Sequence, residues 1–178
     1  MVAVGVRMPN EISIAVTVAV ILSLNFGANI PGESREQSTQ VQQVNLKREL
    51  YKQRQLNKLP RVIAYVTTRA NRTPYVFSGS STSGWDCSGL VRYLYGRIGI
   101  TLPHSADAQA HLGKRVNMPK YGDVVVFAYK GRTDFYHAAI YLGHNLIINA
   151  NREYNTTVIE PLSNFRHSQI RFVRIVGQ

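Results

Sequence analysis

Apolar and polar residues follow two different periods along this chain, a helical one in the middle and a strand-like one towards the C-terminus. Apolar side chains recur at i, i+3 and i+4 over residues 62–70 and again over 91–98, the spacing of one helical face. Because proline suits the first turn of a helix, we predict that the first of these helices starts at Pro60. A third, shorter helix is predicted after the loop at 102–107.

The C-terminal part has the pattern of an antiparallel meander, with runs of β-branched and aromatic residues between turn signals. Strands are predicted at residues 123–129, 137–142, 145–150, 157–159 and 170–176. The second and third of these flank Gly143-His144 and are predicted to form a hairpin. Because helices come first and strands afterwards, the predicted fold class is α+β, with a helix layer packed on one face of an antiparallel sheet.

The first 60 residues differ from this pattern. Ile14 to Leu24 is an apolar run without charge, whose length fits a secretory signal better than a full membrane span. Residues 1–30 are therefore predicted to be a signal peptide or an uncleaved signal-anchor, with a buried helix or strand as the alternative. Residues 31–60, glutamine-rich and then basic, are predicted to be a polar linker, whose basic part over residues 45–59 is expected to form a short solvated helix. The folded domain is predicted to occupy residues 61–178.

Charge and cysteine content narrow the function classes. The formal net charge is +11, and residues 61–178 alone carry fourteen Lys/Arg against six Asp/Glu. Such a basic surface indicates an acidic partner: nucleic acid, anionic lipid or an anionic cell-wall polymer. The single cysteine excludes an internal disulfide and a cysteine-based metal framework.

That cysteine, Cys87, falls in the first turn of the second predicted helix, with Asp86 as the expected N-cap. Free N–H groups and the helix dipole favour a thiolate at this position, whereas the adjacent carboxylate disfavours it. A reactive thiolate therefore needs a cationic partner. The alternative is a buried structural cysteine.

His137 is the best candidate for that partner, because it starts a predicted strand inside an otherwise apolar segment. The other four histidines show no metal-binding spacing. If Gly143 is the midpoint of the hairpin, His137 faces Asn149 on the same side of the sheet. Asn149 could then accept the Nδ1–H of His137. Cys87 as nucleophile, His137 as base and Asn149 as orienting residue form the pattern of a cysteine hydrolase.

Five motifs occur in a characteristic order: PYVFSG (74–79), DCSGLV (86–91), LPHSA (102–106), GDV (122–124) and HAAIYLG (137–143). Together they resemble the NlpC/P60 family of cell-wall peptidases, over residues from about 61 to 176. The resemblance implies a papain-like α+β core without a metal or organic cofactor. It also implies hydrolysis of the γ-D-glutamyl bond to the diamino acid in peptidoglycan stem peptides.

The resemblance also assigns roles by position. Cys87 corresponds to the nucleophile, His137 to the general base and acid, and Asn149 to a third polar residue that is often histidine in the family. Tyr75 matches a tyrosine near the nucleophile and is expected to assist the oxyanion site. A thiolate–imidazolium ion pair between Cys87 and His137 is the expected resting state.

Asp86 and Ser88 match positions that hold the substrate stem in some members of the family. Two departures bear on peptide specificity: Phe77-Ser78-Gly79 stands where members often have Trp-Gly-Gly, and His104 replaces a frequent arginine.

Two other functions remain open at this point. One is an N-acetylmuramoyl-L-alanine amidase of related Cys/His architecture, and the other is a phage virion-associated protein that degrades or binds the cell wall. The expected partners are peptidoglycan and anionic wall polymers, with membrane anchoring through residues 1–30 and no nucleic acid. The expected location is outside the cell or in the cell envelope, or in the virion if the protein is encoded by a phage.

Overall fold

A computed structural model describes residues 32–177, with side chains from residue 36 onwards. The predicted signal peptide or signal-anchor lies outside these residues. The contacts within the chain define two units, Met1–Asn45 and Leu46–Gln178, and the second contains the whole sheet. None of the helices in the described part of the chain has the length and apolarity needed to cross a bilayer.

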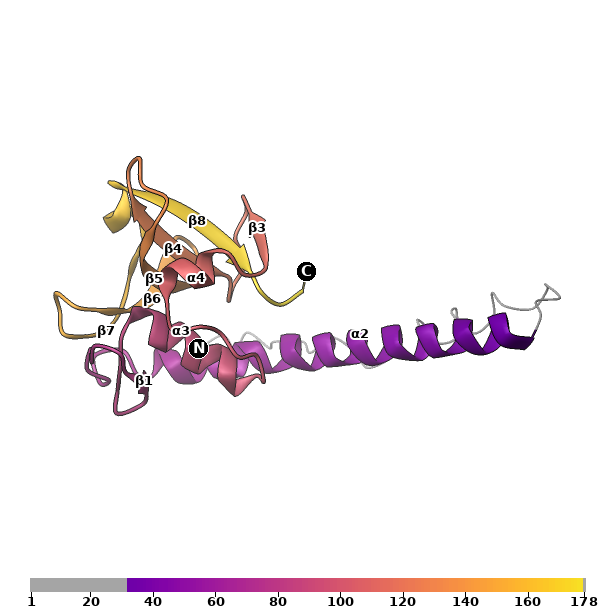
Figure 1. Ribbon diagram of the computed structural model, residues 1–178. Helices are drawn as coiled ribbons and strands as arrows, with labels where there is room; N and C mark the ends of the chain where they lie inside the picture. The colour runs from indigo at the N-terminus through magenta and orange to yellow at the C-terminus, as the bar shows by residue number, and fades with distance from the viewer. Residues whose placement is uncertain (1–31, 178) are drawn as a thin grey trace, which may run out of the picture. The chain divides into compact units, whose positions relative to one another are not determined.

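The second unit is built on a six-stranded antiparallel sheet with the strand order β3-β8-β4-β5-β6-β7 (Figure 1). Its strands are β3 (Lys114–Val116), β4 (Val124–Tyr129), β5 (Phe135–Gly143), β6 (Leu146–Asn151), β7 (Thr156–Pro161) and β8 (Ser168–Arg174). A separate two-stranded pair consists of β1 (Ser80–Ser81) and β2 (Gly84–Trp85). The predicted strands are all present, and β3 is one that the sequence pattern did not predict.

Helices α3 (Cys87–Arg97) and α4 (Ala106–Ala110) pack against β5 in this sheet. A short 3-10 helix, η1 (Leu162–Phe165), follows β7. The α+β class predicted from the order of the elements is therefore confirmed.

Alternate residues of the central strands enter two different clusters, as the two-residue period of a strand requires. On the helix side, Val126, Ala138 and Ile148 pack with apolar residues of α3 such as Leu90. On the other side, buried strand residues pack with partly buried residues of η1 and β8. That cluster contains Val125, Phe127, Ala139 and Ile147, with Leu162, Phe165, Ile170 and Phe172 against it. Because both faces of the sheet are covered, the sequences of the central strands are nearly continuous runs of apolar residues.

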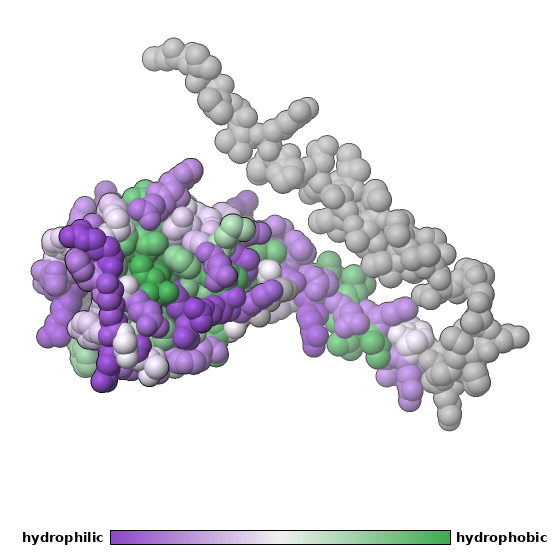
Figure 2. Space-filling view, turned by 90° about the horizontal axis from the view of Figure 1, so that it is seen from above, coloured by the Kyte–Doolittle hydropathy of each residue, from purple (hydrophilic) through white to green (hydrophobic). Residues whose placement is uncertain are grey.

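The surface of the second unit is mostly hydrophilic, with hydrophobic residues gathered in the middle of the face that Figure 2 shows. Large apolar side chains that remain exposed in this unit include Phe77 and Met118, each 82% exposed.

The segment predicted as a linker is helical in the structure. Helix α2 runs without interruption over Gly32–Thr67, with Pro60 inside it, whereas a short helix over residues 45–59 and a separate helix from Pro60 were expected. Residues 33–59 contain neither glycine nor other proline and are rich in Gln, Glu, Lys, Arg and Leu, which are good helix formers. The segment lacks an apolar stripe of helical period over residues 33–44, so the pattern gave no signal there although the propensity did.

The C-terminal half of α2 contributes to the core upstream of residue 61. Leu59 is 7% exposed and belongs to the main apolar cluster, and Gln55 is equally buried. The Tyr51 hydroxyl donates a hydrogen bond of 2.9 Å to the carbonyl of Gly99. The predicted boundary at residue 61 stays a prediction, but these contacts begin about ten residues earlier.

A chain that starts at residue 61 is therefore expected to unfold at lower urea concentration than one that starts at residue 46. The loss of Leu59 from the core alone should cost about 2–5 kcal/mol of unfolding free energy. Leu59→Ala in the longer chain is the matched control and should account for much of the difference. Equal stability of the two chains would contradict the packing role of residues 51–60.

Candidate active site

The candidate nucleophile Cys87 is the first residue of α3, and Asp86 is the N-cap, as predicted. The Asp86 backbone is extended, with φ −89°, and its Oδ1 accepts the N–H of Gly89 at 2.7 Å. This bond satisfies one of the free donors of the first turn. Cys87 therefore has a fixed position at the amino end of the helix.

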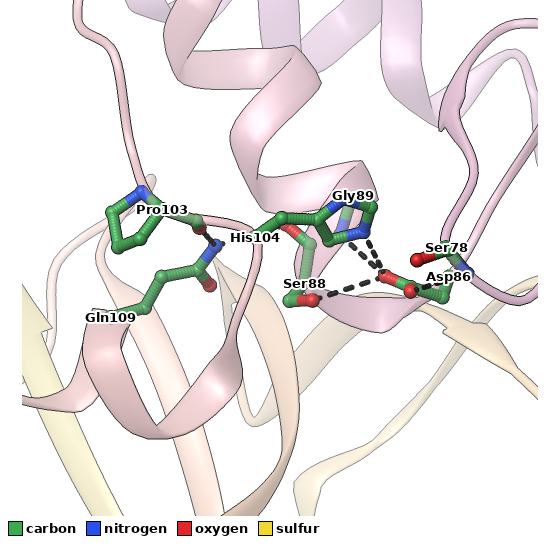
Figure 3. Close-up of polar contacts among 7 residues, drawn as sticks. All are labelled: Ser78, Asp86, Ser88, Gly89, Pro103, His104 and Gln109. Atoms are coloured by element: carbon green, nitrogen blue, oxygen red, sulfur yellow. Dashed lines mark hydrogen bonds and ion pairs between the residues drawn. The ribbon is translucent and has the colours of Figure 1, made fainter.

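The Asp86 carboxylate connects three segments of the site (Figure 3). Oδ2 accepts the N–H of Ser78 at 2.9 Å, and Oδ1 accepts the Ser88 hydroxyl at 3.1 Å. The ring nitrogen Nε2 of His104 lies 2.9 Å from the same Oδ1. Asp86 and Ser88 are 8% and 5% exposed, so both side chains serve the framework of the site. Their predicted contact with substrate stays a prediction.

Gln109 on α4 fixes the loop that carries His104, and sequence reasoning missed it. Its Nε2 donates to the carbonyls of Ser88 (2.9 Å) and Pro103 (2.8 Å), and the side chain is fully buried (Figure 3). Its only signal in the sequence is a polar residue between the alanines of a short helix.

His137 lies on β5 and contacts Asn149 on β6, at 3.0 Å between Nε2 and Asn149 Oδ1. The predicted pairing of these residues is confirmed as a contact, but two details were wrong. The contact uses Nε2 instead of Nδ1, and the hairpin register differs, since Tyr141 pairs with Ile147.

The register differs because the turn is not centred on Gly143. His144 and Asn145 both have positive φ, 50° and 61°, and Gly143 pairs with Leu146 across this two-residue turn. Relative to the predicted register, Tyr141 of β5 pairs with a β6 residue two positions further along the chain, Ile147 instead of Asn145. Because strand side chains alternate between faces, a shift of two leaves Asn149 on the same face as His137.

A second residue that the sequence did not reveal is Glu160 on β7. Its Oε1 accepts Nδ2 of Asn149 at 2.9 Å and Nδ2 of Asn151 at 3.2 Å, and its Oε2 accepts Nδ2 of Asn164 at 2.9 Å. Glu160 is 8% exposed and Asn149 is fully buried. The strand prediction ended at residue 159, so the inward direction of Glu160 could not be inferred.

Cys87 lies against β5 at Ala138, the residue that follows His137 in the chain, because the backbone N–H of Ala138 donates a hydrogen bond to its sulfur. Burial raises the pKa of the Cys87 thiol above its usual value, and the negative charge of Asp86 raises it further. The N–H of Ala138 and those of the first turn of α3 oppose this rise.

Burial also lowers the pKa of His137 from 6.5 to about 4, against the Asn149 hydrogen bond and the charges of Glu160 and Asp86. Its ring stacks on Phe165, with centroids 5.6 Å apart, and lies 5.5 Å from the ring of Phe127. These surroundings favour a neutral thiol and a neutral imidazole, and not the resting ion pair that we expected. The expectation differed because a sequence shows charges but not the loss of solvent around them.

Tyr75 lies close enough to Cys87 and Asp86 to feel their charges, while its expected assistance to the oxyanion site stays a prediction. Burial raises the pKa of its phenol, and the charges of Cys87 and Asp86 raise it further, while Arg152 lowers it. The tyrosine is therefore near both the nucleophile and its N-cap. Its backbone bridges to Trp85, whose indole Nε1 donates to the Thr157 hydroxyl at 2.7 Å inside the core.

No group of three His, Cys, Asp or Glu side chains within residues 36–177 is arranged to hold a metal ion. The candidate site instead combines a thiol at the helix terminus, held against Ala138 of β5, with an imidazole on the preceding residue that contacts the Asn149 amide. Such a set can transfer a proton from a nucleophile and form a covalent intermediate.

The lowered pKa of His137 predicts a loss of stability in acid. Between pH 6.5 and about 4, the unfolded imidazole binds a proton that the folded one does not, so the free energy of unfolding falls as pH falls. The loss should reach about 3 kcal/mol near pH 4 and stop there. Urea unfolding across this range measures it, with His137→Gln as the control that should lack this component. Identical pH dependence of both proteins would contradict the buried neutral imidazole.

Comparison with known proteins places this site in a family context. The sequence profile of the NlpC/P60 family matches residues 72–175. The gamma-DL-glutamyl hydrolase of Bacillus subtilis is 40% identical over 105 residues, which cover 57% of this chain and 25% of that protein. The gamma-D-glutamyl-L-lysine dipeptidyl-peptidase of Bacillus cereus is 33% identical over 93 residues, covering 51% of this chain and 28% of that protein. This chain therefore matches only about a quarter of the length of these relatives.

Solved structures have the same fold. An NlpC/P60 family protein from Bacillus cereus superposes with a TM-score of 0.61 at 27% identity, over 66% of this chain and 40% of that chain. The NlpC/p60 domain of the peptidoglycan hydrolase SagA gives a TM-score of 0.55 at 28% identity, over 64% of this chain and 96% of that chain.

Proposed function

This chain belongs to the NlpC/P60 family, and on that premise we propose that it is a cysteine peptidase that hydrolyses peptidoglycan stem peptides. The observation that carries the proposal is the position of the Cys87 thiol. It lies at the amino end of α3, hydrogen-bonded to the N–H of Ala138, and the residue before Ala138 is His137, whose Nε2 contacts Asn149. A structural cysteine needs neither a neighbouring imidazole nor an amide that orients it.

The proposed reaction starts from the neutral pair. His137 takes the thiol proton as the Cys87 sulfur attacks the peptide carbonyl, so the charge separates only when substrate has displaced water. Backbone N–H groups in the first turn of α3 stabilise the oxyanion, at about 2.7–4 kcal/mol for each donor, and Tyr75 assists from the side. His137 then protonates the leaving amine, and water hydrolyses the thioester to regenerate the thiol.

The proposed bond is that between γ-D-glutamate and the diamino acid. The relatives named as a gamma-DL-glutamyl hydrolase and as a gamma-D-glutamyl-L-lysine dipeptidyl-peptidase support this choice, as does the peptidoglycan endopeptidase RipA of Mycobacterium tuberculosis, 39% identical over 75 residues, 41% of this chain and 15% of that protein. Because this substrate lies outside the cytoplasm, we also propose that the protein acts in the cell envelope or beyond it.

Mass spectrometry of the soluble products from purified peptidoglycan tests this proposal. Cleavage within the stem should release fragments that begin at the diamino acid and leave L-alanyl-D-glutamate on the glycan. Release of whole stems that begin at L-alanine would identify an amidase instead. Absence of any fragment, at enzyme concentrations that bind the polymer, would identify a protein that binds the wall without cleaving it.

A further inference from the structure

Glu160 is a buried carboxylate whose hydrogen-bond partners are all asparagine amides. Three Nδ2 groups donate to it, from Asn149 and Asn151 on β6 and from Asn164 on η1, at 2.9–3.2 Å. Within residues 36–177, neither lysine nor arginine forms an ion pair with it. Burial of a carboxylate without a cation is costly, and neutral donors compensate only in part. A neutral glutamine of the same shape would avoid that cost, so the charge needs another explanation.

The explanation follows from what each group can donate and accept. An ionised carboxylate only accepts hydrogen bonds, so Asn149 must turn its Nδ2 towards Glu160. Its Oδ1 then points at His137, 3.0 Å from Nε2. Because a carbonyl oxygen also only accepts, Nε2 of His137 must carry the hydrogen. In a neutral imidazole the lone pair is then on Nδ1.

We propose that Glu160 is a positioning residue for the hydrolysis proposed above: through Asn149 it selects the Nε2–H tautomer of His137 and leaves Nδ1 as the base for Cys87. The proposal rests on the proposed function for its catalytic meaning, but the tautomer itself is a property of the free protein. Asn149 alone does not fix the tautomer, since its amide makes an equally good contact after a flip. The carboxylate makes one orientation the only satisfied one.

Glu160→Gln tests this directly, because a glutamine amide can donate to Asn149 as well as accept from it. Asn149 is then free to flip and present Nδ2 to the ring, which selects the Nδ1–H tautomer with no base towards the thiol. We expect kcat to fall about tenfold to a hundredfold with KM unchanged. Nitrogen-15 NMR of labelled histidine should show His137 as the Nε2–H tautomer in the native protein and as a mixture in the variant.

The matched control is Asn164→Ala, which removes a hydrogen bond to the other carboxylate oxygen and leaves the bond between Asn149 and Glu160 in place. Its kcat should stay within about threefold of the native value. If it loses as much activity as Glu160→Gln, the carboxylate only supports the local packing, and the proposal is overturned.

A rescue experiment separates tautomer selection from structural support. In the double variant Asn149→Asp with Glu160→Gln, residue 149 is an obligate acceptor for the Nε2–H of His137, and the glutamine amide donates to it. The buried negative charge is kept, but it moves from residue 160 to its hydrogen-bond partner, residue 149. We expect the kcat of this double variant to be at least about tenfold higher than that of Glu160→Gln, and His137 to return to the single Nε2–H tautomer.

Two further results would overturn the proposal: an Nδ1–H tautomer in the native protein, or failure of the double variant to recover activity while it remains folded. Loss of the proposed function would look different. In that case the native protein would release no stem-peptide fragments, while the NMR comparison of native protein and Glu160→Gln would still decide the tautomer.

Discussion

Cys87→Ala is expected to lower the rate of stem-peptide hydrolysis by a factor on the order of 10⁴ or more, because Cys87 is the only cysteine in the sequence and the variant has no thiol to attack the carbonyl. The thiol is small and only partly buried, so its removal should leave the fold intact. Release of soluble fragments from purified peptidoglycan measures the rate, and urea unfolding of the same samples measures the fold.

Cys87→Ser is the informative control for this substitution. It places a hydroxyl where the thiol was. With the neutral His137 as its base, a serine hydroxyl is a far weaker nucleophile towards the peptide carbonyl than the thiol. Its activity should also be very low, with native stability. Substantial hydrolysis by a folded Cys87→Ala protein would show that the reaction occurs elsewhere in the chain.

His137→Gln is expected to reduce hydrolysis by about 10³-fold or more, because the variant has no base to take the thiol proton and no acid to protonate the leaving amine. Glutamine retains an N–H that can reach Asn149 Oδ1, so the hydrogen-bond chain to Glu160 is kept. Initial rates on a purified γ-D-glutamyl stem peptide measure the loss. A reduction of less than tenfold in a folded protein would remove His137 from the reaction.

The sequence pattern selected Cys87, His137 and Asn149 as candidate site residues for reasons that are local. Cys87 follows an N-cap residue and precedes an apolar stripe, and both features depend on neighbours in the chain. The pairing of His137 with Asn149 was predicted from a wrong turn, yet the contact exists. It survived because an error of two residues in register keeps the same face, whereas an error of one would have reversed it.

What the pattern missed depends on contacts that form only in the folded chain. Glu160 acts through β6, which pairs with β7 across one turn, and the predicted strand ended at residue 159, two residues before the observed one. The raised pKa of Cys87 and the lowered pKa of His137 come mainly from burial, for His137 beside Phe127 and Phe165, which a sequence does not display. The helical conformation of residues 33–44 was missed for another reason, since it is formed by propensity without an apolar stripe.

Trapping of the covalent intermediate is the most direct test of cysteine catalysis by this chain. The native protein would be mixed with a γ-D-glutamyl stem peptide, quenched in acid within the first turnover, digested and examined by mass spectrometry. Attack by the thiol predicts that the peptide containing Cys87 gains the mass of the acyl fragment as a thioester, and that hydroxylamine removes it. Steady release of product in the native protein with no adduct on Cys87 at any quench time, and with fragment release unchanged in Cys87→Ala, would contradict it.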